Sequence, residues 1–365
     1  MKILRNYFLR EFFGPLFLSL VALSFVFTLG YLVQVAYLVI NKGVDIASVS
    51  KLFLLRIPAI LTYILPISTL VAILLAMGRL SSDNEMVTIR ASGVNLVRLV
   101  IPLLIVGLIL SLGMVVVNDR VVPYAHFASR KMLVDIGMQN PAAALEPGVF
   151  INSFDKYILF IYAIDGNKLQ NVRIYEPQGE DKPTRIIVAK KGEFVPDLEK
   201  NYIKIKLMDG TADEPDPNNP HSFYKLNFKT YYMTLNFAGL RDKGKIEKKP
   251  RDMTIAELRR ESARLNNEGI ETIPLTTQIH EKLALSFACL VFILLGLPLA
   301  AITRRREKSL NFGIAFIIVG IYYLMLLGCE ALSMQGWLEP SIGLWIPNLL
   351  FAGVGGYLTF RLCAY

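Results

Sequence analysis

Six apolar stretches, each long enough to cross a membrane as a helix, constrain this chain more than any other feature of its sequence. They lie at roughly 14–40, 52–77, 96–118, 282–303, 310–333 and 342–363. A helix rises about 1.5 Å per residue, so about 20 apolar residues cross the ~30 Å hydrocarbon core. The hydrophobic content of 53% and the mean hydropathy of +0.45 also exceed what is typical of water-soluble proteins. We therefore predict a membrane protein with three spans on each side of a polar middle.

Basic residues are distributed unevenly between the two sides of these spans. The polar middle, 123–277, carries 23 of the 39 Lys and Arg residues and 21 of the 30 Asp and Glu residues, so most of the net charge of +9 belongs to the membrane part. One side of the spans carries Lys2, Arg5, Arg10, Arg79, Arg90, Arg98, Arg304, Arg305, Arg306, Lys308 and Arg361. The first short loop on the other side has only Lys42 and Lys51. The positive-inside rule then places both termini in the cytoplasm and the middle outside, and the high pI needs no nucleic-acid partner.

The chain divides into an N-terminal membrane half (1–122), a middle domain (123–277) and a C-terminal membrane half (278–365). Within the middle domain, residues 145–238 alternate apolar and polar side chains in short bursts that are separated by turn clusters. This pattern predicts an antiparallel β-sandwich of about seven to nine short strands. After it, Thr254 is followed three residues later by a glutamate, which predicts a helix with a capping box.

A polar segment, GRLSSDNEMVTIRASGV, separates the second and third apolar stretches. We expect a short helix over about 81–92, with Ser81 or Ser82 as its N-cap and Gly93 as its stop signal. The side chains that we expect on a face open to the cytosol, suited to docking, are Glu85, Met86, Ile89 and Arg90. The alternative is a solvated helix that only joins two spans.

Motifs for catalysis and metal binding are missing from the sequence. His126, His221 and His280 are far apart and lie in no HExxH motif, and the three cysteines all lie in apolar stretches. There is also no GxSxG, GxGxxG or GxxxxGK[ST] motif. We expect no catalytic residue, no metal site and no cofactor in this chain, so any ATP that drives it must be bound by another chain.

The order of these features resembles the LptF/LptG family of lipopolysaccharide-export permeases. The likeness covers the whole chain and is carried by the polar segment above, by QNPAAALEPGVF (139–150) and by WIPNLL (345–350). It implies six transmembrane helices with an inserted all-β, jelly-roll-like periplasmic domain, in the bacterial inner membrane. It also implies a paralogous six-span permease, a homodimeric cytoplasmic ATPase that binds ATP and Mg, a periplasmic β-jelly-roll bridge protein, and lipopolysaccharide as the cargo.

The resemblance also implies roles for individual residues. In the family, the short helix fits a groove on the ATPase, and Glu85 stands at the family's acidic position. For lipid binding we expect Lys42 and Arg56 at the level of the headgroup, with Glu330 close enough to pair with Arg56 when the cavity is empty. The basic residues that family members carry at the outer end of the first span have no counterpart before Lys42.

Other functions fit the sequence less well. A secondary transporter would carry ionisable residues near the middle of the membrane and broken helices in matched halves. A lipid-modifying enzyme would need paired carboxylates on an external loop as its acid and base. A lipoprotein-release permease is closer in kind, but such chains usually have four spans.

Overall fold

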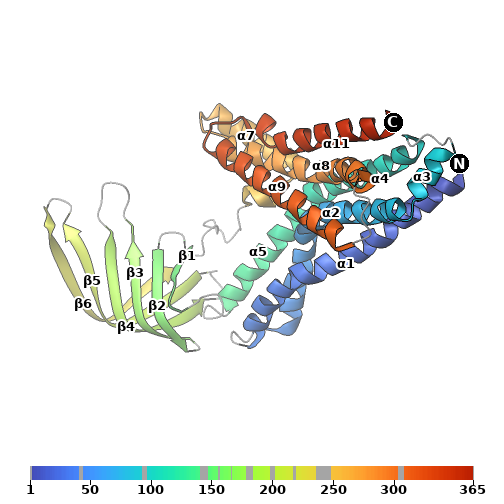
Figure 1. Ribbon diagram of the computed structural model, residues 1–365. Coiled ribbons are helices and arrows are strands. Elements are labelled where there is room, and N and C mark those ends of the chain that lie inside the picture. The colour runs from blue at the N-terminus through green and yellow to red at the C-terminus, as the bar shows by residue number, and fades with distance from the viewer. Residues whose placement is uncertain are drawn as a thin grey trace. The chain divides into compact units, whose positions relative to one another are not determined.

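The computed structural model describes residues 2–40, 44–92, 97–139, 147–154, 157–165, 167–177, 184–197, 202–216, 219–235, 248–302 and 308–364. The chain forms two compact units, coloured by residue number in Figure 1. Unit 1 comprises Met1–Tyr31, Leu55–His126 and Lys249–Tyr365. Unit 2 comprises Leu32–Leu54 and Phe127–Lys248.

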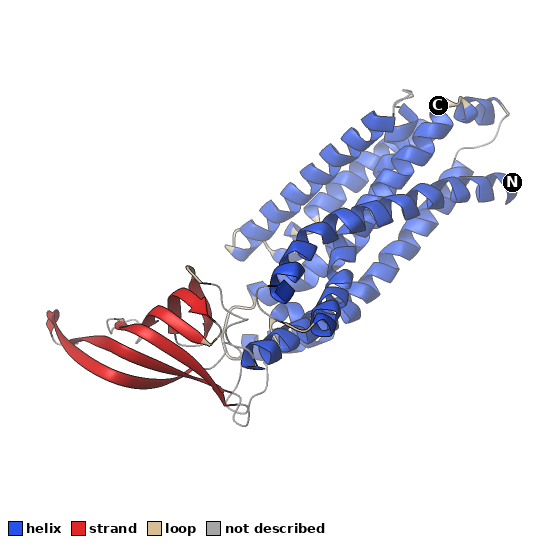
Figure 2. Cartoon of the chain, turned by 90° about the horizontal axis from the view of Figure 1, so that it is seen from below, coloured by secondary structure: helices blue, strands red, loops and turns tan. Residues whose placement is uncertain are grey.

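Helices account for almost all of unit 1, and every strand among the described residues belongs to unit 2. Figure 2 shows the helices in blue and the strands in red. The helices are α1 (Lys2–Ile40), α2 (Ile46–Ser82), α3 (Glu85–Ala91), α4 (Val97–Val116), the π-helix η1 (Val117–Val121), α5 (Val122–Gln139), the 3₁₀-helix η2 (Pro250–Asp252), α7 (Ile255–Asn267), α8 (Ile273–Ile302), α9 (Lys308–Met334), α10 (Pro340–Gly343) and α11 (Ile346–Ala364). Six helical segments of the described chain are long and apolar enough to cross a membrane, which confirms the prediction from the sequence. The predicted capping box is also confirmed, because Thr254 caps α7 and exchanges hydrogen bonds with Glu257.

The centre of unit 1 is α8, which packs against α4 and α11. Small residues allow this packing, because a Cβ atom at Gly355 of α11 would lie 2.8 Å from the backbone nitrogen of Leu295 on α8. Such close approach of helix backbones is the usual way in which membrane helices associate. Both chain termini and α3 lie at the same end of unit 1 (Figure 1), which we call the termini end.

Unit 2 contains one antiparallel sheet whose strands are neighbours in the order of the chain. Its strands are β1 (Phe150–Phe154), β2 (Tyr157–Asp165), β3 (Lys168–Glu176), β4 (Arg185–Asp197), β5 (Tyr202–Asp216) and β6 (Asn219–Leu235). The inserted all-β domain is confirmed, but the expected sandwich of seven to nine short strands is wrong for the described residues. The strands are fewer and longer than expected, since β5 has 15 residues and β6 has 17 residues.

In the long strands β3, β4 and β5, the buried side chains change partway along the strand from odd-numbered to even-numbered positions. In β3, Leu169 is buried and the next buried residue is Val172, so two exposed residues lie between them instead of one. Beyond Val172 the regular alternation resumes with Ile174. Asn171 in β3 and Asp209 in β5 have positive φ angles of 50° and 53°, which bend the backbone where the parity changes. The sheet therefore keeps one apolar face although β3 does not alternate regularly over its full length.

Candidate functional site

The turn before α3 differs from the expected cap. Ser81 and Ser82 belong to the last turn of α2, where their hydroxyl groups donate to the carbonyl oxygens of Ala301 and Arg79. Asn84, with a φ angle of 59°, precedes α3 and accepts the backbone N–H of residue 88 at 3.1 Å. The expectation that Ser81 or Ser82 caps this helix is therefore wrong. Glu85 does lie in the first turn of α3, as expected.

The apolar face of α3 turns toward the bundle. Met86 is only 8% exposed and belongs to the core of unit 1, and Ile89 packs against the same core. Val87 is 53% exposed. The expectation that Met86 and Ile89 lie open to solvent is therefore wrong, because the bundle already covers them. Arg90 lies within α3, but its side chain is outside the described part of the chain.

Glu85 is engaged by a side chain from the beginning of α1. The hydroxyl group of Tyr7 lies 2.8 Å from Oε2 and 3.1 Å from Oε1 of Glu85, and donates its proton to this carboxylate. The same hydroxyl accepts a hydrogen bond of 2.9 Å from Nη2 of Arg79. Arg79 also pairs with Glu11 at 3.0 Å. These four residues thus join the N-terminal part of α1, the last turn of α2 and α3.

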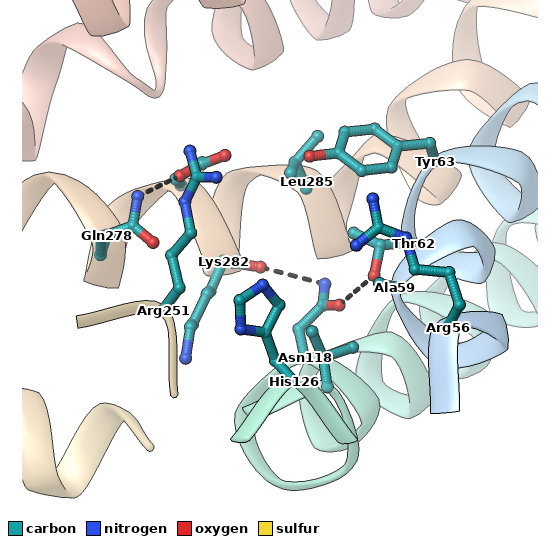
Figure 3. Close-up of a pocket in the computed structure, with 12 residues that line it drawn as sticks. Arg56, Ala59, Thr62, Tyr63, Asn118, His126, Arg251, Gln278, Lys282 and Leu285 are labelled. Carbon is teal, nitrogen blue, oxygen red and sulfur yellow. Dashed lines mark hydrogen bonds between the residues drawn. The ribbon is translucent and has the colours of Figure 1, made fainter. Parts of the chain in front are cut away.

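A polar pocket of about 180 Å³ lies between α2, η1, α5 and α8, and Figure 3 shows the residues that line it. The α2 residues of this lining belong to the first half of the helix, whereas α3 follows its last turn. Its charged lining residues are Arg56, Arg251, Lys282 and Glu281. Glu281 accepts a hydrogen bond of 2.7 Å from Nε2 of Gln278, and Lys282 donates to the carbonyl oxygen of residue 253. With three cations and one carboxylate, the pocket can accept an anionic group.

Asn118 joins three helices beside this pocket. It is 3% exposed, accepts a hydrogen bond of 2.6 Å from the hydroxyl group of Thr62, and donates one of 2.9 Å to the hydroxyl group of Ser286 (Figure 3 shows the bond to Thr62). Asn118 lies in η1, and the wider turn of a π-helix offsets its side chain from the regular α-helical positions. The next residue, Asp119, accepts the first backbone N–H of α7, from Ile255, at 2.6 Å. The π-helix therefore fixes both the wall of the pocket and the start of α7.

A second acidic side chain orders the segment that follows the sheet. Asp252 is 2% exposed, accepts the backbone N–H of Lys249 at 2.9 Å and lies 2.8 Å from Nδ1 of His126. Its oxygen atoms thus have partners despite burial, as buried carboxylates require. This arrangement holds η2, and with it Arg251, at the edge of the pocket.

Arg56 is the one residue expected to bind lipid that lines this pocket among the described residues. Its guanidinium group lies 5.9 Å from the centre of the Tyr31 ring. Glu330 lies on α9. No ion pair between it and Arg56 occurs among the described side chains, and its role in lipid binding stays a prediction. Lys42 lies outside the described residues.

Sequence reasoning did not include Glu281 and Lys282 among the site residues, although a signal was present. Two adjacent ionisable residues open the fourth apolar stretch, and such residues inside a span are rare and commonly functional. Asn118 carried no comparable signal, because its partners are distant in sequence. Among the described residues there is no cluster of three or more side chains that could hold a metal ion.

The comparisons with known proteins agree with this architecture. The family model of the lipopolysaccharide export system permease LptF/LptG matches residues 6–361. This chain belongs to the LptF/LptG family. The LptF permease protein of the lipopolysaccharide export system from Escherichia coli strain K12 is 21% identical over 352 residues, which cover 96% of this chain and 92% of that protein. An uncharacterized protein, RP871, from Rickettsia prowazekii is 23% identical over 236 residues, or 64% of each chain.

Family membership and six apolar helices identify a multi-pass protein of the inner membrane and a lipopolysaccharide-export permease. The resemblance that the sequence motifs carried is thereby confirmed. The roles of individual residues, including Glu85 and Arg56, stay predictions.

Proposed function

We propose that this LptF/LptG-family chain is one of two permease subunits in an ATP-driven exporter that takes lipopolysaccharide from the outer leaflet of the inner membrane and passes it to a periplasmic bridge. The observation that supports this most is the family match over residues 6–361, since it includes the spans and the inserted sheet together. In this scheme the chain itself is not catalytic. ATP and Mg are bound by a homodimeric cytoplasmic ATPase, and the second permease is a paralogue with six spans.

We place the termini end in the cytoplasm and the sheet in the periplasm, because most basic residues outside the polar middle flank the spans on the side of the termini. The ATPase then meets α3, where Val87 is exposed and Glu85 is held by Tyr7. Glu85 offers a carboxylate for a charge-assisted pair with an arginine of the ATPase. A shift of α3 reaches the bundle directly, because Met86 is packed in its core.

In this scheme an anionic lipid headgroup passes the pocket that lies at the other end of α2 from α3. The cations of this pocket are Arg56, Arg251 and Lys282. Arg56 has no carboxylate within ion-pair distance among the described residues, so an incoming phosphate would not compete with a protein carboxylate for its guanidinium group. Lys42, two residues after the end of α1 in the sequence, would add a further cation. The cargo's acyl chains need an apolar wall, which the second permease would complete together with this chain's exposed apolar helix faces.

The sheet offers a route for the lipid beyond the membrane. β1 and β6 are its first and last strands, and each has a neighbour on one side only within the described sheet. An open edge can pair with a strand of another β domain, which would extend one apolar face from this protein to the bridge.

Purification of the tagged chain from its native membrane tests the proposal. A small Walker-motif ATPase and a second six-span chain should accompany it in stoichiometric amounts. Recovery of the chain alone, with full lipid-transport activity and no ATPase, would overturn the proposal.

A further inference from the structure

The beginning of α1 and the beginning of α3 come together at two adjacent residue pairs. Tyr7 bonds to Glu85, and the next residues along each helix, Phe8 and Met86, line the same small gap in the core of unit 1. Tyr7 and Glu85 are joined by a hydrogen bond, whereas Phe8 and Met86 share a place in the core. Tyr7 and Glu85 are 78 positions apart in sequence, so their bond joins separate segments of the chain.

The hydrogen-bonded link between α1 and α3 depends on the hydroxyl group of Tyr7. Arg79 and Glu85 form no direct ion pair within 4.0 Å in the described structure, and the Tyr7 hydroxyl lies between them, accepting from Arg79 at 2.9 Å and donating to Glu85 at 2.8 Å. A hydrogen bond to a charged partner is roughly twice as strong as one between neutral groups. The hydroxyl has charged partners on both sides, so its loss would disconnect Glu85 from both α1 and α2.

Phe8 and Met86 belong to the same apolar core. Phe8 is 3% exposed and Met86 is 8% exposed. α3 has only seven residues, and isolated helices of that length are not stable in water. These contacts with α1 and the bundle therefore determine where α3 lies.

We propose that Tyr7 is a positioning residue for coupling. It fixes the direction of the Glu85 carboxylate and makes the N-terminal part of α1 move together with α3. The inference rests on the proposed function, since it assumes that a partner ATPase acts on α3. Through Tyr7, displacement of α3 reaches α1, a continuous helix from Lys2 to Ile40, in addition to α2 and α4, which flank α3 in the chain.

The test is Tyr7→Phe, which keeps the ring and removes only the hydroxyl group. In the purified complex, the amount of bound ATPase and the rate of ATP hydrolysis should stay within about twofold of wild type. The lipid released per ATP hydrolysed should fall about tenfold, as expected for the loss of one hydrogen bond to a charged group. Tyr357→Phe, at a position 67% exposed on α11, is the matched control and should leave this ratio unchanged.

Two further variants separate positioning from a general role in folding. Glu11→Gln weakens the pair with Arg79 and leaves the bond between Tyr7 and Glu85 intact, so it should affect the ratio much less than Tyr7→Phe does. In a Glu85→Gln background, Tyr7→Phe should cause little additional loss, because Tyr7 acts through Glu85.

Additive losses in the double variant, or an unchanged ratio in Tyr7→Phe, would overturn the inference alone. Equal losses of bound ATPase and lipid release, with a lowered melting temperature, would also overturn it, because Tyr7 would then only stabilise the fold. If the wild-type chain binds no ATPase, the proposed function fails as well, and the inference fails with it.

Discussion

Replacement of Asn118 by leucine tests how much the polar contacts between α2, η1 and α8 stabilise the bundle. The substitution keeps a similar volume and removes an amide that is 3% exposed. It deletes the bonds to Thr62 at 2.6 Å and to Ser286 at 2.9 Å, and a longer bond of 3.4 Å to the carbonyl oxygen of Lys282.

The expected loss of stability follows from what the two hydroxyl groups do afterwards. Thr62 can still donate to the carbonyl oxygen of Pro58 at 3.4 Å, and Ser286 still donates to that of Lys282 at 2.7 Å, so neither is left without a partner. Hydrogen bonds between membrane helices contribute about 0.6 kcal/mol on average and up to ~1.7 kcal/mol. The two shorter bonds together therefore predict that Asn118→Leu lowers the free energy of unfolding by roughly 1 to 3 kcal/mol.

Unfolding of the purified chain in detergent, followed by tryptophan fluorescence, measures this loss. Asn267→Leu, at an exposed position at the end of α7, makes the same chemical change outside the cluster and should shift stability by less than about 0.5 kcal/mol. If Asn118→Leu is as stable as wild type, or is no worse than the Asn267 control, the reasoning about this cluster is wrong.

Three other predictions follow from the same contacts. Glu85→Lys should abolish lipid export, while the ATPase either keeps some ATP hydrolysis or dissociates. Reversing the charge of the facing ATPase arginine should restore part of the export activity. Wild-type export by Glu85→Lys would exclude the role assigned to Glu85. Arg56→Ala should lower lipid-stimulated ATP hydrolysis more than the basal rate, whereas equal losses would indicate a folding defect. Gly355→Leu should lower the free energy of unfolding by about 1 to 3 kcal/mol or more, because its Cβ would meet the backbone of Leu295 at 2.8 Å; Gly356→Leu, where no atom of a neighbouring helix lies within 4 Å of the added Cβ, is the control and should be far milder.

The features that the sequence alone predicts well are those set by length and local pattern. Six apolar stretches correspond to six helices because a span needs about 20 apolar residues whatever its neighbours are. The cap of α7 was also predictable, since Thr254 and Glu257 are three residues apart and satisfy each other locally.

The features that the sequence misses depend on contacts between distant residues. Met86 has the pattern of an exposed amphipathic helix, but it is buried in a core to which residues from distant parts of the chain, such as Phe8 and Leu297, contribute. The sheet looked like more and shorter strands because its buried face changes parity near Asn171 and Asp209, which breaks the simple alternation. The prediction of the pocket residues was incomplete for the same reason. The walls of the pocket come from four helices, and Arg251 reaches it from η2.

Reconstitution of the complete complex into liposomes that contain lipopolysaccharide tests the central proposal most directly. We expect that addition of ATP and Mg transfers lipopolysaccharide to the soluble periplasmic bridge domain, that complexes without this chain transfer none, and that the Glu85→Lys variant transfers none either. Transfer at the wild-type rate without the ATPase, or without this chain, would contradict the account.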